Sequence, residues 1–70
     1  MKGEEKTIPR LLTPPEAAQL LRTSAQHLAN LRSKSAGPVY CKLGAKVVYP
    51  VDRLADYVAA RVVAPGSPRR

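Results

Sequence analysis

Two side-chain amides near the middle of the chain, Gln26 and Asn30, are four residues apart. In a helix, this spacing places both side chains on one face, about one turn from each other. An amide presents a donor and an acceptor side by side, and these two groups can form two hydrogen bonds with the N6 and N7 atoms of adenine. The pair therefore suggests recognition by hydrogen bonding rather than a chemical reaction.

The residue types that usually perform catalysis or bind metals do not form a convincing group. Cys41 is the only cysteine and His27 the only histidine, so a zinc site lacks ligands and an internal disulfide is impossible. Asp52 and Asp56 are one helical turn apart, but no nucleophile or partner base accompanies them. We therefore expect no enzymatic activity, no metal and no cofactor, and we expect Cys41 to be a small buried strand residue.

The charge of the chain is strongly positive and unevenly distributed. Twelve lysines and arginines against five aspartates and glutamates give a formal net charge of +7 over 70 residues. No acidic residue lies between residues 17 and 51. The basic residues of this interval are Arg22, Arg32, Lys34, Lys42 and Lys46. This central half of one sign predicts a polyanionic partner, although a basic surface could also serve solubility alone.

The length predicts one small domain, which we place at residues 10–62. Residues 1–9 and 63–70 are polar or rich in proline, glycine, serine and arginine, and we expect them to be mobile tails. We find no signal peptide and no apolar run long enough to cross a bilayer. The sequence therefore predicts a cytoplasmic protein that does not bind membranes.

The segment LLTPPEAAQLL predicts a helix over about residues 14–21. Thr13 is a good N-cap, Pro14 fits the first helical position, and Glu16 completes a capping box with Thr13. We expect the buried side of this helix to consist of Ala17, Leu20 and Leu21.

A second helix is expected over about residues 25–34, after a connection of about three residues. Thr23 or Ser24 can cap it, and Ser24 is the better candidate. At 100° per residue, Ala25, Leu28 and Leu31 form an apolar stripe. The opposite face carries Gln26, His27, Asn30, Ser33 and Lys34. Arg32 lies at the edge of the stripe, where its stem can pack and its head can reach outward. Two helices joined this tightly form a helix-turn-helix arrangement.

Residues 39–49 predict a β-hairpin, because two runs of β-branched and aromatic residues flank Gly44 and Ala45. A three-residue loop over 44–46 would place Cys41, Leu43, Val47 and Tyr49 on one face, whereas a two-residue loop would pair Leu43 with Lys46. We favour the three-residue loop because it gives a wholly apolar inner face. A third helix over 51–63 follows from the helical spacing of Val51, Leu54, Tyr57, Val58 and Val62. The predicted fold class is thus mainly α with a β-hairpin.

Three segments in this order resemble the excisionase-type DNA-binding domains, small MerR-like relatives of the mercury-resistance regulators. LLTPPEAAQLL resembles the family's opening pattern hLTpeEAAelL, and TSAQHLANLR resembles its recognition helix. CKLGAKVVYPVDRLADYV resembles its wing and closing helix, with Lys42, Gly44, Tyr49 and Leu54 at the expected spacing. The likeness spans about residues 11–60. Family members often have Pro, Arg and Trp where this chain has Ala25, Gln26 and Leu31, which suggests a lightly charged recognition helix.

The resemblance implies a winged helix-turn-helix fold with a two-stranded wing and sequence-specific binding of double-stranded DNA. The second helix of such a fold enters the major groove. The candidate base-reading residues are Gln26, His27, Asn30 and Ser33. The candidate phosphate-binding residues are Arg22, Thr23, Ser24, Arg32 and Lys34. The candidate wing residues at the minor groove are Lys42, Gly44 and Lys46. Roughly five phosphate contacts predict a log–log salt slope of about −4 to −5.

The resemblance also implies an excisionase, or recombination directionality factor, encoded by a bacterium or phage. Such a protein would bind tandem sites near an attachment site, bend the DNA and direct a partner integrase to excise a mobile element. Several copies would associate head to tail on the DNA, without a small-molecule effector. The nearest alternative is a small prophage-type transcriptional regulator of the same fold, and a protein-interaction module is a rival from another class.

Overall fold

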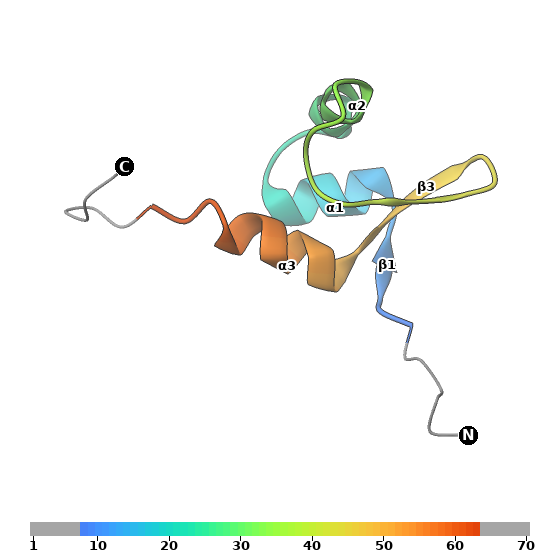
Figure 1. Ribbon diagram of the computed structural model, residues 1–70. Helices are drawn as coiled ribbons and strands as arrows, with labels where there is room; N and C mark the ends of the chain where they lie inside the picture. Colours follow the sequence, from blue (N-terminus) through green and yellow to red (C-terminus); the bar gives the residue numbers. More distant parts are fainter. Residues whose placement is uncertain (1–7, 64–70) are drawn as a thin grey trace, which may run out of the picture.

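The computed structural model describes residues 8–63, which form three helices and a three-stranded antiparallel sheet (Figure 1). The elements in chain order are β1 (Leu11–Leu12), α1 (Pro14–Leu21), α2 (Ala25–Ser33), β2 (Cys41–Leu43), β3 (Lys46–Pro50) and α3 (Val51–Ala59). The predicted tails lie outside the described residues, except for Ile8, Pro9 and Val63, which are exposed. No helix of the described part is long and apolar enough to cross a membrane.

The sheet has one strand more than the predicted hairpin. Its order is β1-β3-β2, so β3 is the central strand, and Leu12 of β1 pairs with Tyr49. The backbone N–H of Val51 donates to the carbonyl oxygen of Arg10 at 2.9 Å, which supplies an acceptor for one of the free N–H groups at the start of α3. The segment before α1 therefore forms hydrogen bonds both with β3 at the base of the hairpin and with the first residue of α3.

The preferred register of the hairpin was wrong. Cys41 pairs with Val48, and Leu43 pairs with Lys46, so the loop consists of Gly44 and Ala45 alone. Gly44 has a φ of 64° at the first loop position, the conformation for which two-residue type II′ hairpins use glycine. The turn chemistry thus overrides the wholly apolar face on which the prediction relied.

Helix α1 begins as predicted, with a complete capping box. The Thr13 N–H donates to Glu16 Oε1 at 2.9 Å, and the Glu16 N–H donates to Thr13 Oγ1 at 3.3 Å. Its buried side was predicted incorrectly at one position, because Leu20 is 59% exposed while Ala18 is buried. Leu20 lies about 200° around the helix from Ala18, so the two cannot share a face.

Helix α2 follows a three-residue connection and is capped by Ser24, whose Oγ accepts the His27 N–H at 3.0 Å. After it, the chain turns through Gly37, which has a φ of 87°. A Cβ at Gly37 would lie 2.9 Å from the Cβ of Leu31, so the turn fits against α2 only because this residue has no side chain.

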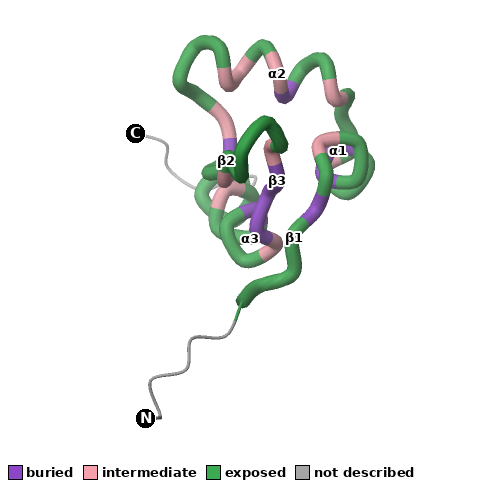
Figure 2. The backbone as a smooth tube through the Cα atoms, turned by 90° about the vertical axis from the view of Figure 1, so that its right-hand side faces the viewer, coloured by how far each residue is buried: buried purple, intermediate pink, exposed green. Residues whose placement is uncertain are grey.

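One hydrophobic core joins all three helices to the sheet. Its buried members are Leu12, Ala17, Ala18, Leu28, Tyr49 and Leu54. Figure 2 shows β3 running through the middle of the molecule as its most continuously buried segment.

Helix α3 ends at Ala59, before its predicted end at residue 63, and Val58 and Val62 are 48% and 71% exposed. Without core contacts, a last helical turn gains little stability.

Candidate nucleic-acid interface

The outward face of α2 carries the predicted base-reading residues. Gln26, His27, Asn30 and Ser33 are all exposed, as is Lys34 directly after the helix, whereas Leu28 points into the core with 1% exposure. A serine cap and an inward apolar stripe are sufficient to place these polar side chains together. The sequence therefore located this face correctly, and the structure adds how its members contact each other.

The two amides are hydrogen-bonded to each other. Gln26 Nε2 donates to Asn30 Oδ1 at 3.0 Å, and Ser33 Oγ donates to the Asn30 carbonyl oxygen at 2.8 Å. An amide nitrogen carries two hydrogens, so Gln26 keeps one donor and its Oε1 acceptor for another molecule. The hydrogen bond holds the Gln26 side chain against Asn30 and leaves Asn30 its own NH₂ donors.

The connection between α1 and α2 presents Arg22, Thr23 and Ser24 to solvent. Arg22 adopts the left-handed conformation with a φ of 60°, and its N–H donates to the Ala18 and Gln19 carbonyls. This turn closes α1 and directs the chain into α2. It brings the Arg22 charge and two hydroxyl groups next to the N-terminus of α2, where backbone N–H groups favour an anion.

Arg32 is held differently from the other predicted phosphate-binding residues. Its Nη1 donates to Tyr49 Oη at 2.6 Å, and its guanidinium carbon lies 5.7 Å from the ring centroid of Tyr40 and 5.9 Å from that of Tyr49. The side chain is half-buried, whereas Arg22 and Lys34 are exposed. The sequence indicated a stem that packs and a head that reaches outward, but the head itself contacts the hairpin.

The predicted wing residues lie at or near the tip of the hairpin, and all three are exposed. In the observed register, Lys42 pairs with Val47 and shares a face with Tyr40 and Tyr49, while Lys46 is on the opposite face. Because Tyr49 contacts Arg32, the Lys42 face is the one turned toward α2. Gly44 has open space around it, and no atom outside its neighbours lies within 4 Å of a Cβ built there.

The described acidic residues, Glu16, Asp52 and Asp56, are exposed and belong to α1 and α3. Hydrogen bonds from the backbone and hydroxyl of Thr13 hold the pKa of the Glu16 carboxyl below its ordinary value. Helix α2 and the hairpin carry no acidic residue. Together with the connection before α2, these elements therefore present exposed polar and basic residues without an acidic one among them. We call this set of residues the basic surface and define it by Arg22, Gln26, His27, Asn30, Lys34, Lys42 and Lys46.

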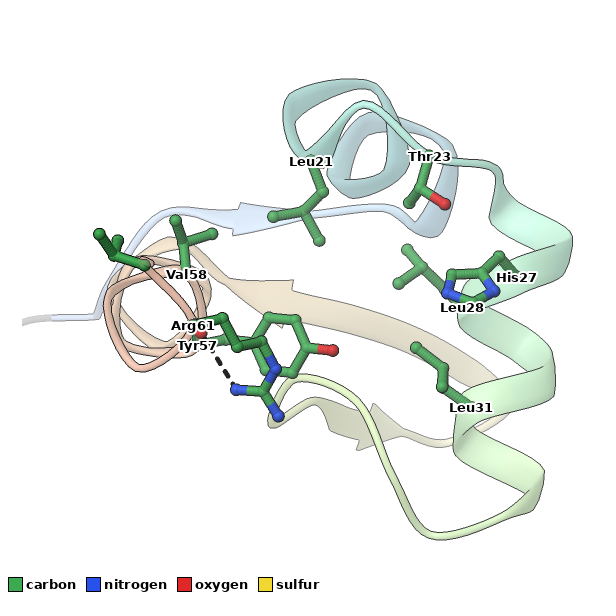
Figure 3. A pocket seen from close by; sticks show the side chains of 9 residues that line it. Leu21, Thr23, His27, Leu28, Leu31, Tyr57, Val58 and Arg61 are labelled. Atoms are coloured by element: carbon green, nitrogen blue, oxygen red, sulfur yellow. Dashed lines mark hydrogen bonds between the residues drawn. The ribbon is translucent and has the colours of Figure 1, made fainter. Parts of the chain in front are cut away.

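A groove that the sequence did not indicate lies between α2 and α3 (Figure 3). Leu28 and Leu31 point into it from α2, and Tyr57 and Arg61 enter from the side of α3. The Arg61 guanidinium stacks 3.7 Å above the Tyr57 ring centroid and donates from Nη1 to the Tyr57 carbonyl oxygen at 3.1 Å. The groove is lined mainly by apolar side chains.

Within residues 8–63, no three histidine, cysteine or acidic side chains are grouped so that they could hold a metal ion. Cys41, predicted to be buried, is half-buried in β2. No protein-family model matches the chain, and no curated protein matches it in sequence.

Proposed function

We propose that this chain is a sequence-specific double-stranded DNA-binding protein with a winged helix-turn-helix arrangement. The observation that carries the proposal is the basic surface, because it combines an exposed polar helix face with a basic hairpin and contains no acidic residue. Helices α1 and α2 supply the helix-turn-helix, and β2 and β3 supply the wing. A solvated helix face usually mixes both charge signs, and this one does not.

In this proposal, α2 enters the major groove with Gln26 foremost. The free Oε1 and remaining Nε2 hydrogen of Gln26 pair with an adenine edge, while Asn30 orients Gln26 and contacts an adjoining base. His27 and Ser33 extend the reading face. Arg22, Thr23, Ser24 and Lys34 contact phosphates, which fixes the register of the helix on the duplex. The hairpin lies along the minor groove through Lys42, Gly44 and Lys46.

At the level of biological role, we propose an excisionase, a recombination directionality factor that bends DNA near an attachment site and directs an integrase toward excision. The order of helices and hairpin and the resemblance of three sequence segments to excisionase-type domains support this role. One domain of this size offers a small contact area, so copies bound head to tail on tandem sites would supply the affinity.

The test of base reading uses sites selected from a random duplex library and quantitative gel-shift titration. Gln26→Ala is expected to reduce the preference for the selected site over an unrelated duplex by roughly 5- to 150-fold, the value of one bidentate base contact, with non-specific affinity unchanged. Asn30→Ala should lose part of the same preference. Gln19→Ala is the matched control, because Gln19 is an exposed amide on α1 outside the basic surface.

If Gln26→Ala and Asn30→Ala both bind the selected site as the parent does, the assignment of the reading face is wrong. If the selection enriches no sequence, sequence-specific DNA binding itself is contradicted.

Footprinting on the DNA that flanks the gene, with and without a candidate partner integrase, tests the biological role. Tandem protected sites at an attachment region, together with strong bending, are expected of an excisionase. A single protected site that overlaps a promoter would instead identify a transcriptional regulator of the same fold.

A further inference from the structure

The contact between Arg32 and the tyrosines joins the two parts of the basic surface. Arg32 is in the last turn of α2, and Tyr49 is in the central strand β3, 17 residues later in the chain. The hydrogen bond between them is 2.6 Å long, and Tyr40 and Tyr49 approach each other with ring centroids 6.1 Å apart. This is a specific polar contact between the reading helix and the hairpin, rather than an incidental approach of two surface side chains.

The burial of Tyr49 gives this contact its importance. Tyr49 has no exposed surface, so water has little access to replace a lost partner of its hydroxyl group. A buried polar group without a hydrogen-bond partner is costly, and a guanidinium is a strong donor. The rings of Tyr40 and Tyr49, both within 6 Å of the guanidinium carbon, add cation–π attraction. The guanidinium thus interacts with three groups at once: the Tyr49 hydroxyl, the Tyr49 ring and the Tyr40 ring.

The rest of α2 is less firmly attached to the molecule. Leu28 is its one fully buried residue, and Ala25, Ala29, Leu31 and Arg32 are half-buried. Leu28 fixes the distance of the helix from the core. Leu31 also packs against the core near the C-terminal end of α2. The Arg32 contact, one turn after Leu28, adds a directional polar link from this end of the helix to the hairpin.

We propose that Arg32 is a positioning residue that sets the angle between α2 and the hairpin, instead of a phosphate contact as the sequence suggested. The inference rests on the proposed DNA-binding function, because the angle matters when helix and wing must meet one duplex together. Its consequence is that Arg32 affects how well a cognate site is bound and adds nothing to the number of phosphates neutralised.

Two substitutions separate the roles. Tyr49→Phe keeps the ring and removes the hydroxyl acceptor, while Arg32→Lys keeps the charge and removes the planar, multi-donor group. For a positioning role, both are expected to lower affinity for the selected site about 3- to 10-fold, on the scale of one hydrogen bond, and to leave the salt slope unchanged. Lys34→Ala is the comparison, and it should flatten the slope by about 0.9.

A phosphate-binding role makes the opposite forecast. Tyr49→Phe would then be silent, Arg32→Lys would bind nearly as the parent does, and Arg32→Gln would flatten the salt slope by about 0.9. That pattern would overturn the proposal.

A second measurement needs no DNA, so it keeps this inference separate from the proposed function. Residual dipolar couplings of backbone amides report the orientation of α2 relative to β3 in the free protein. Both Tyr49→Phe and Arg32→Lys should change the orientation of α2 relative to β3 or widen its range, while Lys34→Ala should leave it as in the parent. Thermal unfolding confirms that every variant is folded. Unchanged couplings in both variants would refute the positioning role even if the parent binds DNA. Altered couplings would support it even if the parent does not.

Discussion

At the level of single residues, two glycines are required for different structural reasons. Gly37 and Gly44 both have positive φ, at 87° and 64°, which an L-residue adopts at a cost. At Gly37 the Cβ of Leu31 is also too close for any side chain, whereas the space around Gly44 is open. The two positions therefore separate backbone strain from steric exclusion.

Alanine at each glycine tests this distinction. Gly44→Ala is expected to lower the free energy of unfolding by about 1 kcal/mol, through the left-handed conformation alone. Gly37→Ala adds a clash with α2 and is expected to cost about 3 kcal/mol, which a small domain can barely tolerate. Urea unfolding followed by circular dichroism measures both. Equal losses at the two positions would show that the Leu31 contact relaxes freely.

At the level of whole elements, local sequence rules predicted most of the structure. The starts of α1 and α2 follow from Thr13, Glu16 and Ser24, because these capping groups act on the N–H groups of the first helical turn. Strand β1 was missed since two residues have no periodicity, and Leu11 and Leu12 join a sheet only through Tyr49 and Pro50. The predicted register of the hairpin was wrong because it was chosen to give a wholly apolar face, whereas the turn preference of Gly44 favours the two-residue loop.

In the candidate site, helical periodicity alone identified the exposed face of α2, because this face depends only on residues within three turns of each other. The contact of Arg32 with Tyr49 depends on how two distant elements pack, and no local pattern in the sequence encodes it.

The capping box of α1 gives the stability of the molecule a dependence on pH. Because the folded state lowers the pKa of Glu16 below its ordinary value of about 4.5, the ionised carboxylate stabilises the fold above that pH. This contribution is lost as the pH falls through the lowered pKa. Glu16→Gln retains an acceptor for the Thr13 N–H without titrating, so its unfolding temperature should decline less than that of the parent between pH 5 and about pH 3. Parallel declines in calorimetry would mean that other carboxylates control the acid transition.

At the level of the whole molecule, the acids on α1 and α3 and the basic surface give the protein two electrically different parts. In the proposed DNA complex, with Arg32 held by the hairpin, the cationic groups of the basic surface that contact phosphates would be Arg22, Lys34, Lys42 and Lys46. Four such contacts predict a log–log salt slope of about −3.6, less steep than the sequence-based range.

The contribution of the hairpin to this slope can be measured by removing one charge. Lys42 is on the hairpin face turned toward α2, so Lys42→Ala should flatten the slope by about 0.9 in gel-shift titrations over a salt series. Arg53→Ala removes an equal charge from an exposed position on α3 and should leave the slope as in the parent. Flattening by both variants would indicate a diffuse charge effect instead of a defined wing contact.

The order β1-β3-β2 leaves β2 at an edge of the sheet, and among the described residues nothing pairs with its outer side. Open edges invite strand addition between molecules, and short strands with a central lysine resist it. Strand β2 has three residues, and Lys42 is the middle one. Lys42 therefore also opposes edge-to-edge aggregation of the protein. Keeping this lysine preserves colloidal stability at the high concentrations that binding and NMR experiments require.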